Sequence, residues 1–345
     1  MIRRCMEMFG FELTDYDRKV YKEFLKDFLP DKMIDIHTHV WKKELARQGA
    51  SNGGAAWPAR VADECTVEDL MQTYKDLFPG KKVTPVIFGS CDHNISQVNR
   101  YAMESGKKYN LPYFYRTSYD IDPETLEKEV VEGGFKGLKP YLSNKPEYIP
   151  DGEIRIFDFL PHEHLKIADK HGLIVILHIA RGERLRDRVN IAQLMEIEEK
   201  YPNVKLVVAH IGRAYAESDI GNAFETLKKT ENMMFDFSAN TLDTAMMRCI
   251  EAVGPNRVLF GSDMPISKMR MYRIVENGKY INVVPRSMYG DVSGDSHMRE
   301  TDETDVTSFI YEELLAFRRA AEKLGLSKND VENITCKNAE RILGL

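Results

Sequence analysis

Two histidines separated by one residue, His37 and His39, are the first candidates for chemistry in this sequence. They lie in the stretch 33–39, where apolar residues alternate with Asp35 and the two histidines. Successive side chains of a β-strand point to opposite faces, so the three polar side chains are expected on one face of a strand. Imidazole nitrogen is a good ligand for zinc and related ions. The stretch therefore predicts a metal site at the end of a strand.

A second pair with the same spacing, His162 and His164, is interpreted differently. It follows a proline and leads into residues 165–170, whose pattern is helical with proline in the first turn. Residues two apart on a helix do not share a face. We therefore assign His162 and His164 to helix-start and surface roles, and keep the first pair as the ligand candidates.

Length and composition describe a globular protein without a basic surface. The chain has 345 residues, 43% hydrophobic and 30% charged, with a formal net charge of −6. The negative charge and the lack of a long basic stripe argue against nucleic acid. No stretch has the length of a membrane span or the features of a signal peptide. We expect a small-molecule substrate as the partner, with neither nucleic acid nor a membrane.

The 5 cysteines are scattered and include no Cys-x-x-Cys pair. An odd number at irregular spacing suits free thiols in a reducing compartment better than a disulfide framework. This pattern indicates a cytoplasmic protein.

Strand-like and helix-like segments alternate along the chain. The expected strands are 33–39, 83–88, 112–119, 134–142, 173–179, 205–211, 233–238 and 257–262. Several are nearly continuous apolar runs, as is typical of parallel strands buried on both faces. Strands separated by helices, without a composition shift that would mark a linker, predict one α/β domain over 1–345, a (β/α)8 TIM barrel. A doubly wound open sheet is the alternative, weakened by the lack of a Gly-x-Gly-x-x-Gly fingerprint after the first strand.

Three segments fall outside the expected repeat. Residues 1–32 form an N-terminal helical extension, with a helix expected at 15–29. Residues 41–66 are rich in small and turn-forming residues and predict a long loop that could cover a site. Residues 266–304 are an insertion after the eighth strand, expected over the barrel mouth as a lid or specificity segment. The insertion would serve equally as a subunit contact, so the sequence allows a homo-oligomer.

The ends of the expected strands carry a set of residues suited to chemistry. In a barrel these ends meet at one mouth. The candidates are His37 and His39 after the first strand, Lys139 after the fourth, His178 after the fifth, His210 after the sixth and Asp263 after the eighth. A single buried histidine would more often be a core residue whose hydrogen bonds are satisfied by its neighbours. Ligand-type residues converging from several strands predict a metal site.

The motifs IDIHTH, GLKPYL, ILHIA, VVAHIGR and LFGSDMP follow one another in this order. Together they resemble the metal-dependent hydrolases of the amidohydrolase superfamily, and the closing NITCKNAERILGL resembles their usual C-terminus. The resemblance spans about residues 33–345 and is greatest to the amidohydrolase-related branch. That branch includes hydrolases and nonoxidative decarboxylases such as aminocarboxymuconate-semialdehyde decarboxylase.

The resemblance implies roles for the strand-end residues. His37, His39, His178 and Asp263 would hold one divalent metal ion, with zinc as the first choice. His210 would orient or polarise water and substrate, and Asp263 would also act as the catalytic base. In binuclear relatives the lysine equivalent to Lys139 is carbamylated and bridges two metals, whereas this branch commonly uses one.

Several cationic side chains could line the mouth and bind a carboxylate of the substrate: Lys139, Arg181, Arg213 and Arg116. Each arginine could equally belong to a helix start or a salt bridge. The leading hypothesis is metal-assisted hydrolysis of an amide, ester or lactone. The alternatives are nonoxidative decarboxylation on the same metal, a metal-free aldolase with Lys139 as Schiff-base nucleophile, and a binding protein with a relict metal site.

Overall fold

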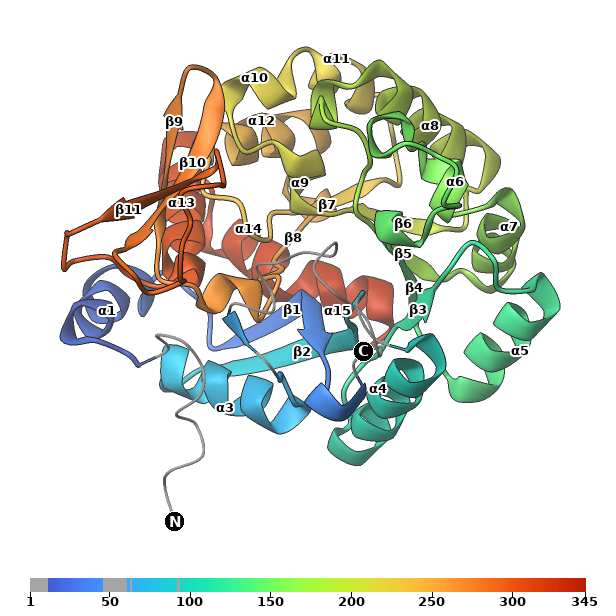
Figure 1. Cartoon of the computed structure of the whole chain (residues 1–345), viewed down its shortest axis with the longest axis horizontal. Helices are drawn as coiled ribbons and strands as arrows, with labels where there is room; N and C mark the ends of the chain where they lie inside the picture. The colour runs from blue at the N-terminus through green and yellow to red at the C-terminus, as the bar shows by residue number, and fades with distance from the viewer. Residues whose placement is uncertain (1–11, 46–60, 63, 92–93) are drawn as a thin grey trace.

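The structure, a computed structural model, describes residues 12–45, 61–62, 64–91 and 94–345. Its centre consists of parallel strands enclosed by helices (Figure 1). A two-stranded sheet pairs β1 (Lys32–Val40) with β2 (Lys82–Gly89). A six-stranded sheet contains β3 (Tyr115–Thr117), β4 (Gly137–Pro140), β5 (Ile174–Leu177), β6 (Lys205–Val208), β7 (Met234–Asp236) and β8 (Val258–Leu259). All pair in parallel and in chain order, which confirms the predicted α/β succession and does not match a doubly wound order.

The two sheets meet at two junctions, here called seams, and a single bridge joins them at each seam. Ile87 of β2 pairs with Tyr113, and Thr38 of β1 pairs with Met264. A closed barrel would have continuous strand pairing at both seams. In this structure each seam has a single bridge instead. The second seam bears on the site, because it ties the strand of the His-x-His pair directly to the segment that follows β8.

Helices surround the strands and alternate with them in sequence (Figure 1). Those between the strands are α3 (Val67–Leu77), α4 (Ile95–Tyr109), α5 (Pro123–Gly133), α6 (Ile156–Phe159), α7 (His162–His171), α8 (Arg188–Lys200), α9 (His210–Arg213), α10 (Glu217–Ile220), α11 (Ala223–Leu227) and α12 (Asp243–Val253). The chain ends with α13 (Phe309–Leu324), α14 (Lys328–Glu332) and α15 (Asn338–Leu343). None of the described helices combines the length and apolarity that crossing a membrane requires. Cys65, Cys249 and Cys336 are buried free thiols.

Local sequence explains where the helices begin. The N-terminus of α3 is held by a capping box between Thr66 and Asp69. The second His-x-His pair begins α7 after Pro161, as expected. The surface role predicted for His164 is wrong, however, because this side chain is buried and lies 2.9 Å from the carbonyl oxygen of Ile121. The apolar face of α7 that packs against the strands includes this position.

Two clusters of apolar side chains make up most of the core. The inner cluster lies among the strands and includes Ile34, Ile36 and Phe88, and the last residues of the chain complete it. The outer cluster packs the other strand faces against the helices. Burial on both faces explains why the strand sequences are nearly uninterrupted apolar runs.

The segment after β8 forms a small sheet of its own. It contains β9 (Tyr272–Glu276), β10 (Lys279–Pro285) and β11 (Met298–Thr301), in the order β11-β10-β9. β9 and β10 are antiparallel, whereas β10 and β11 are parallel. Residues 46–60 and 63, which make up most of the predicted loop 41–66, lie outside the described residues.

The N-terminal extension contains α1 (Asp15–Val20), which continues as a π-helical turn to Leu25 within the predicted helix. The buried carboxylate of Asp17 binds the guanidinium of Arg270 at 2.8 Å and accepts a hydrogen bond from Thr307. Burial alone would raise the pKa of Asp17, but Arg270 and Thr307 hold it below its usual range. The stabilisation is complete above the unfolded-state pKa of about 3.9, and is lost as the pH falls through the lower folded-state pKa.

Asp17→Asn should lower the free energy of unfolding by about 3 kcal/mol, because Arg270 would keep a buried charge without a carboxylate partner. Urea denaturation measures this loss. Asp15→Asn is the matched control, since Asp15 lies on the same helix in an exposed pair with Arg18 and should contribute little. Equal losses in the two variants would contradict the role assigned to Asp17.

Candidate active site

A cavity of about 500 Å³ opens at the carboxyl ends of the strands. Its lining includes every predicted strand-end candidate: His37, His39, Lys139, His178, His210 and Asp263. The insertion contributes to the same wall through Ile266, Met269, Arg273, Tyr280 and Asn282. Side chains from distant parts of the sequence therefore meet around one space.

The strand that carries His37 and His39 is irregular. Its register against β2 shifts between Asp35 and Thr38. The prediction that Asp35 shares a face with the two histidines is wrong. The Asp35 carboxylate accepts a hydrogen bond from the hydroxyl of Tyr74 on α3 at 2.6 Å, and also binds the backbone N–H of His37. The irregularity thus turns Asp35 toward the helix layer while both imidazoles line the cavity.

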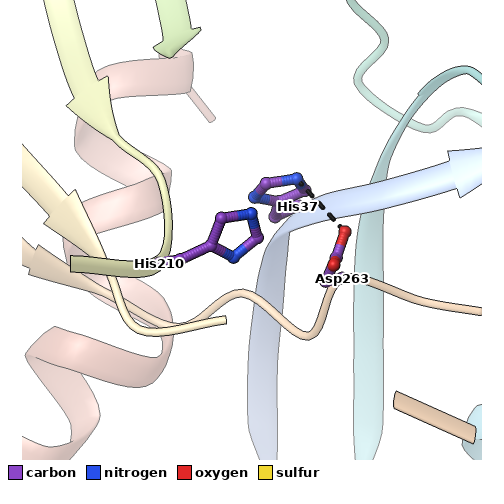
Figure 2. A group of neighbouring side chains, drawn as sticks. All are labelled: His37, His210 and Asp263. Atoms are coloured by element: carbon purple, nitrogen blue, oxygen red, sulfur yellow. Dashed lines mark ion pairs between the residues drawn. The ribbon is translucent and has the colours of Figure 1, made fainter. Parts of the chain in front are cut away.

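Three ligand-type side chains form a close group: His37, His210 and Asp263 have ligand atoms within 4.8 Å of one another (Figure 2). The Nε2 atom of His37 is 3.5 Å from Oδ1 of Asp263. Two ligands of one tetrahedral zinc ion, each bound at about 2.0 Å, would lie roughly 3.3 Å apart. The spacing fits a shared metal ion.

A carboxylate behind His37 fixes the orientation of its ring. Oδ2 of Asp236, at the end of β7, lies 3.0 Å from Nδ1 of His37. Since a carboxylate only accepts, the imidazole proton lies on Nδ1 and Nε2 presents a lone pair to the cavity. Burial, with Lys139 nearby, lowers the pKa of His37 to about 3, so the ring is neutral, as a metal ligand must be.

The residues from His210 to Arg213 form a left-handed turn, not the end of a strand. Their φ angles are 58°, 48°, 60° and 61°. The strand is predicted to reach residue 211, but it ends at Val208. The backbone becomes left-handed from His210, and strand pairing cannot continue through such a turn. Left-handed backbone costs about 1–2 kcal/mol per non-glycine residue, and such strain concentrates at functional sites.

Hydrogen bonds hold His210 in this conformation. Its backbone N–H donates to Oδ1 of Asp236 at 2.8 Å, and its Nδ1 lies 2.9 Å from the carbonyl oxygen of Ser238. A carbonyl cannot donate, so the proton is on Nδ1 and the Nε2 lone pair remains for the cavity. His210 and His37 thus present the same kind of atom to the site.

Three contacts in a row depend on the protons of Tyr141 and His39. The Tyr141 hydroxyl lies 2.8 Å from the carbonyl oxygen of Gly89 and 2.8 Å from Nδ1 of His39, and Nε2 of His39 lies 2.8 Å from Oδ1 of Asp263. A neutral His39 carries one N–H and Tyr141 one O–H, so two protons serve three contacts. Burial lowers the pKa of His39 although Asp263 opposes this, and the charged ring is disfavoured. A cation bound between Nε2 and Oδ1 would remove the need for the missing proton.

His178 shows a second unsatisfied atom. Its ring lies 5.3 Å from that of His210, measured between centroids, and its buried Nδ1 has no hydrogen-bond partner among the described residues. A buried polar atom without a partner is unfavourable. The set of imidazole nitrogens and a carboxylate is the donor chemistry of zinc sites, so these residues fit a metal ion.

The charges of Lys139 and Asp263 balance within the site. Nζ of Lys139 lies 3.2 Å from Nε2 of His37, and burial lowers the pKa of Lys139 to about 8. Burial would raise the pKa of Asp263, but the hydrogen bond to His39 and electrostatic interactions with the neighbouring histidines hold it below its usual range. Asp263 is therefore an anion and Lys139 a cation near neutral pH.

The predicted arginines differ in their positions. Arg213 lines the cavity. Arg181 is paired with Asp187 at 2.9 Å and does not line it. Arg116 is fully buried, donates to the carbonyl of Cys91 at 2.6 Å and is also absent from the lining. Of the three, only Arg213 is placed to touch a ligand, and Arg273 is a lining arginine that the sequence did not single out.

Sequence reasoning also missed Asp236 and Tyr141. Asp236 is the one acidic residue within the apolar run 233–237, at the carboxyl end of an expected strand. That signal is the same as the one used for His178 and could have identified it. Tyr141 had no comparable signal, since its role depends on the approach of β4 to Gly89.

Comparison with known proteins gives a family and a fold. The family model described as amidohydrolase matches residues 34–278. No curated protein sequence matches the chain significantly.

Solved structures resemble the whole chain. A zinc-bound amidohydrolase from Burkholderia multivorans is 14% identical, with a TM-score of 0.60 and coverage of 91% of this chain and 99% of its own. The "probable 2-pyrone-4,6-dicarboxylic acid hydrolase" from Acinetobacter baumannii, with citric acid bound, is 14% identical, with a TM-score of 0.56 and coverages of 91% and 99%. A 2,6-dihydroxybenzoate decarboxylase with 2,6-dihydroxybenzoate is 13% identical, with a TM-score of 0.55 and coverages of 92% and 100%. At these identities the likeness shows the fold.

Gly261→Ala should displace His37, because the added methyl group would contact it on the side away from the cavity. A Cβ atom at this position would lie 2.8 Å from Cβ of His37 and 3.3 Å from Cβ of Ser238. We expect a loss of about 2 kcal/mol in the free energy of unfolding, together with a lower metal content, because His37 must move. Gly182→Ala is the control, since its added Cβ would meet nothing within 4 Å. Unchanged stability and metal content in Gly261→Ala would refute this packing.

Proposed function

Since the chain belongs to the amidohydrolase family, we propose that it is a metal-dependent hydrolase. Its substrate would be a small carboxylate-bearing compound with an amide, ester or lactone bond. The observation that carries this proposal is the row of three 2.8 Å contacts from Gly89 through Tyr141 and His39 to Asp263, which a neutral His39 leaves one proton short. Family members and structural neighbours are enzymes, hydrolases or decarboxylases, and the cavity has room for a small ligand.

One divalent ion, zinc by preference, would be held by His37, His39, His178 and Asp263. The unsatisfied Nδ1 of His178 and the lone pairs of the other histidines support this set. The zinc in the Burkholderia multivorans structure supports the choice of metal. His210 is close enough to act as a further ligand, but we assign it to substrate and water because its ring is fixed by a strained turn.

When bound, the ion would polarise a substrate oxygen and lower the pKa of a water molecule toward neutrality. Asp263, held as an anion, would accept a proton at its carboxylate and return it to the leaving group. The Nε2 atom of His210 would accept a hydrogen bond from water and keep it oriented toward the scissile bond. Lys139 would bind the carboxylate of the substrate, and Arg213 would add a further cationic group to the wall of the cavity. Arg181 and Arg116 have structural contacts instead and are withdrawn from this role.

We also propose that the strands form a (β/α)8 barrel within a single domain, with residues 1–32 as an extension. The parallel order and the bridges at both seams support this architecture. Residues 266–304 would act as the specificity segment, since several of them line the cavity. The free thiols of Cys65, Cys249 and Cys336 are compatible with a cytoplasmic location.

Nonoxidative decarboxylation is the alternative reaction. The observation that favours it is the resemblance to 2,6-dihydroxybenzoate decarboxylase, which covers 92% of this chain. A panel of aryl esters, lactones and aromatic carboxylic acids would separate the two reactions. We expect metal-dependent hydrolysis of an aryl ester to an acid and a phenol, or of a lactone to a single hydroxy acid. Release of CO₂ without hydrolysis of any panel member would replace hydrolysis by decarboxylation.

The purified protein should contain about one divalent ion per chain, because the proposed ligands complete one zinc site with a coordination position to spare. His37→Ala and His39→Ala should each lose most of the ion and the activity, as measured by elemental analysis and turnover. His162→Ala is the matched control from the second His-x-His pair, since His162 contacts Tyr201 outside the cavity. A metal-free wild-type protein, or equal damage in the control, would contradict the proposed site.

Asp263→Asn should separate metal binding from proton transfer. The amide oxygen could still approach an ion, but the amide cannot accept a proton near neutral pH. We therefore expect partial metal retention and a fall in turnover of about a hundredfold or more in the metal-loaded variant. Near wild-type turnover would show that Asp263 is not the base and would transfer that role to His210.

A further inference from the structure

Two arginines on the wall of the cavity, Arg213 and Arg273, form no ion pair with any residue in the described ranges. Neighbouring arginines are paired: Arg184 binds Asp219 at 2.7 Å, and Arg181 binds Asp187 at 2.9 Å. This part of the wall therefore presents two guanidinium groups that no described carboxylate contacts directly.

The structure fixes the position of Arg273 while leaving donors unused. Its Nε donates to Oδ1 of Asn282 at 2.8 Å, and its Nη1 donates to the carbonyl of Ala239 at 2.9 Å. The guanidinium carbon lies 4.6 Å from the ring centre of Tyr215 and 4.8 Å from that of Tyr280. A guanidinium has more N–H donors than these contacts use. The remaining ones are preorganised for a ligand.

A buried carboxyl group, that of Glu313, lies behind this wall. It accepts a hydrogen bond from the backbone N–H of Ala239 at 2.6 Å. Burial raises the pKa of Glu313 well above its usual value, with Asp35 adding to the effect, so its anionic form is disfavoured. Glu313 braces the backbone of Ala239, whose carbonyl positions Arg273.

Arg213 reaches the same region from another element. It ends the left-handed turn that begins with His210, and both residues line the cavity. Its Nη1 donates to the carbonyl of Arg181 at 3.1 Å. The backbone N–H of Tyr215 donates to the carbonyl of Arg213 at 2.9 Å, so the two residues lie side by side on the wall. Burial raises the pKa of Tyr215, and the charges of Arg273 and Arg213 both oppose that rise. Burial also lowers the pKa of each arginine, which an anionic ligand would reverse.

We propose that Arg213 and Arg273, with Tyr215 and Tyr280 between them, form an anion subsite that binds a second carboxylate of the substrate. Arg273 and Tyr280 belong to the insertion, so the insertion confers this specificity. The aromatic rings on the wall favour a flat molecule. The substrate class is thus a small, flat dicarboxylate, or a carboxylate-bearing lactone or ester whose acid group is remote from the scissile bond.

This inference rests on the proposed function, which places the scissile bond of the substrate at the metal site. Its test does not require turnover. Isophthalate and its neutral diamide, isophthalamide, are titrated calorimetrically into the metal-loaded protein and again after chelation. Isophthalate should bind at least about tenfold more tightly than the diamide. Arg273→Gln and Arg213→Gln should each weaken isophthalate binding by about tenfold or more, with unchanged metal content and little effect on the diamide.

Arg299→Gln is the matched control, because Arg299 lies on β11 of the same small sheet, is paired with Glu276 at 2.6 Å and does not line the cavity. Its isophthalate affinity should equal that of the wild type. Arg213 and Arg273 lie on different elements, so unfolding of one variant, detected by thermal melting, leaves the other as a test.

The outcomes distinguish the subsite from the metal site. No preference for isophthalate in the wild type, or a preference that survives both substitutions, would overturn the subsite even if the protein binds metal and hydrolyses esters. An arginine-dependent preference that persists after chelation would support it, and would do so even in a protein that proved to hold no metal.

Discussion

The contact between the carboxylate of Asp263 and the imidazole nitrogen of His39 is the constraint on which the site depends. The two atoms lie 2.8 Å apart, and with His39 neutral one of the three contacts from Gly89 through Tyr141 and His39 to Asp263 lacks a proton. The backbone enforces this proximity, because the N–H of His39 donates to the carbonyl of Met264, and the N–H of Asp263 donates to the carbonyl of His37. The seam between β1 and the segment after β8 therefore holds His39 and Asp263 together, and a cation between them is the simplest way to stabilise the contact.

The residues behind the site determine which atoms face the cavity. Asp236 binds the ring of His37 and the backbone of His210, so one carboxylate orients two histidines. The left-handed turn then extends the arrangement from His210 to Arg213. Strain of this kind persists only where the surrounding packing over-determines the conformation. The same rigid support would serve chemistry at one end of the cavity and anion recognition at the other.

Sequence alone predicted the parts of this structure that depend on repeated local patterns. The strand order follows from apolar runs separated by helices, and the meeting of His37, His178 and Asp263 follows from the shared mouth of parallel strands. It could not predict that a register shift turns Asp35 toward α3, because alternation assumes a regular strand. Nor could it separate Arg213 from Arg181, since both follow a histidine by three residues and only tertiary contacts pair one of them with Asp187.

X-ray absorption at the zinc edge, combined with anomalous diffraction from crystals of the metal-loaded protein, tests the central claim most directly. The account predicts one anomalous peak between His39, His37 and Asp263, with nitrogen and oxygen ligands at about 2.0–2.2 Å and no sulfur in the coordination shell. A peak elsewhere in the molecule, or a shell with sulfur at about 2.3 Å, would contradict it. So would a diffraction map in which His39 and Asp263 remain in contact with no ion near them.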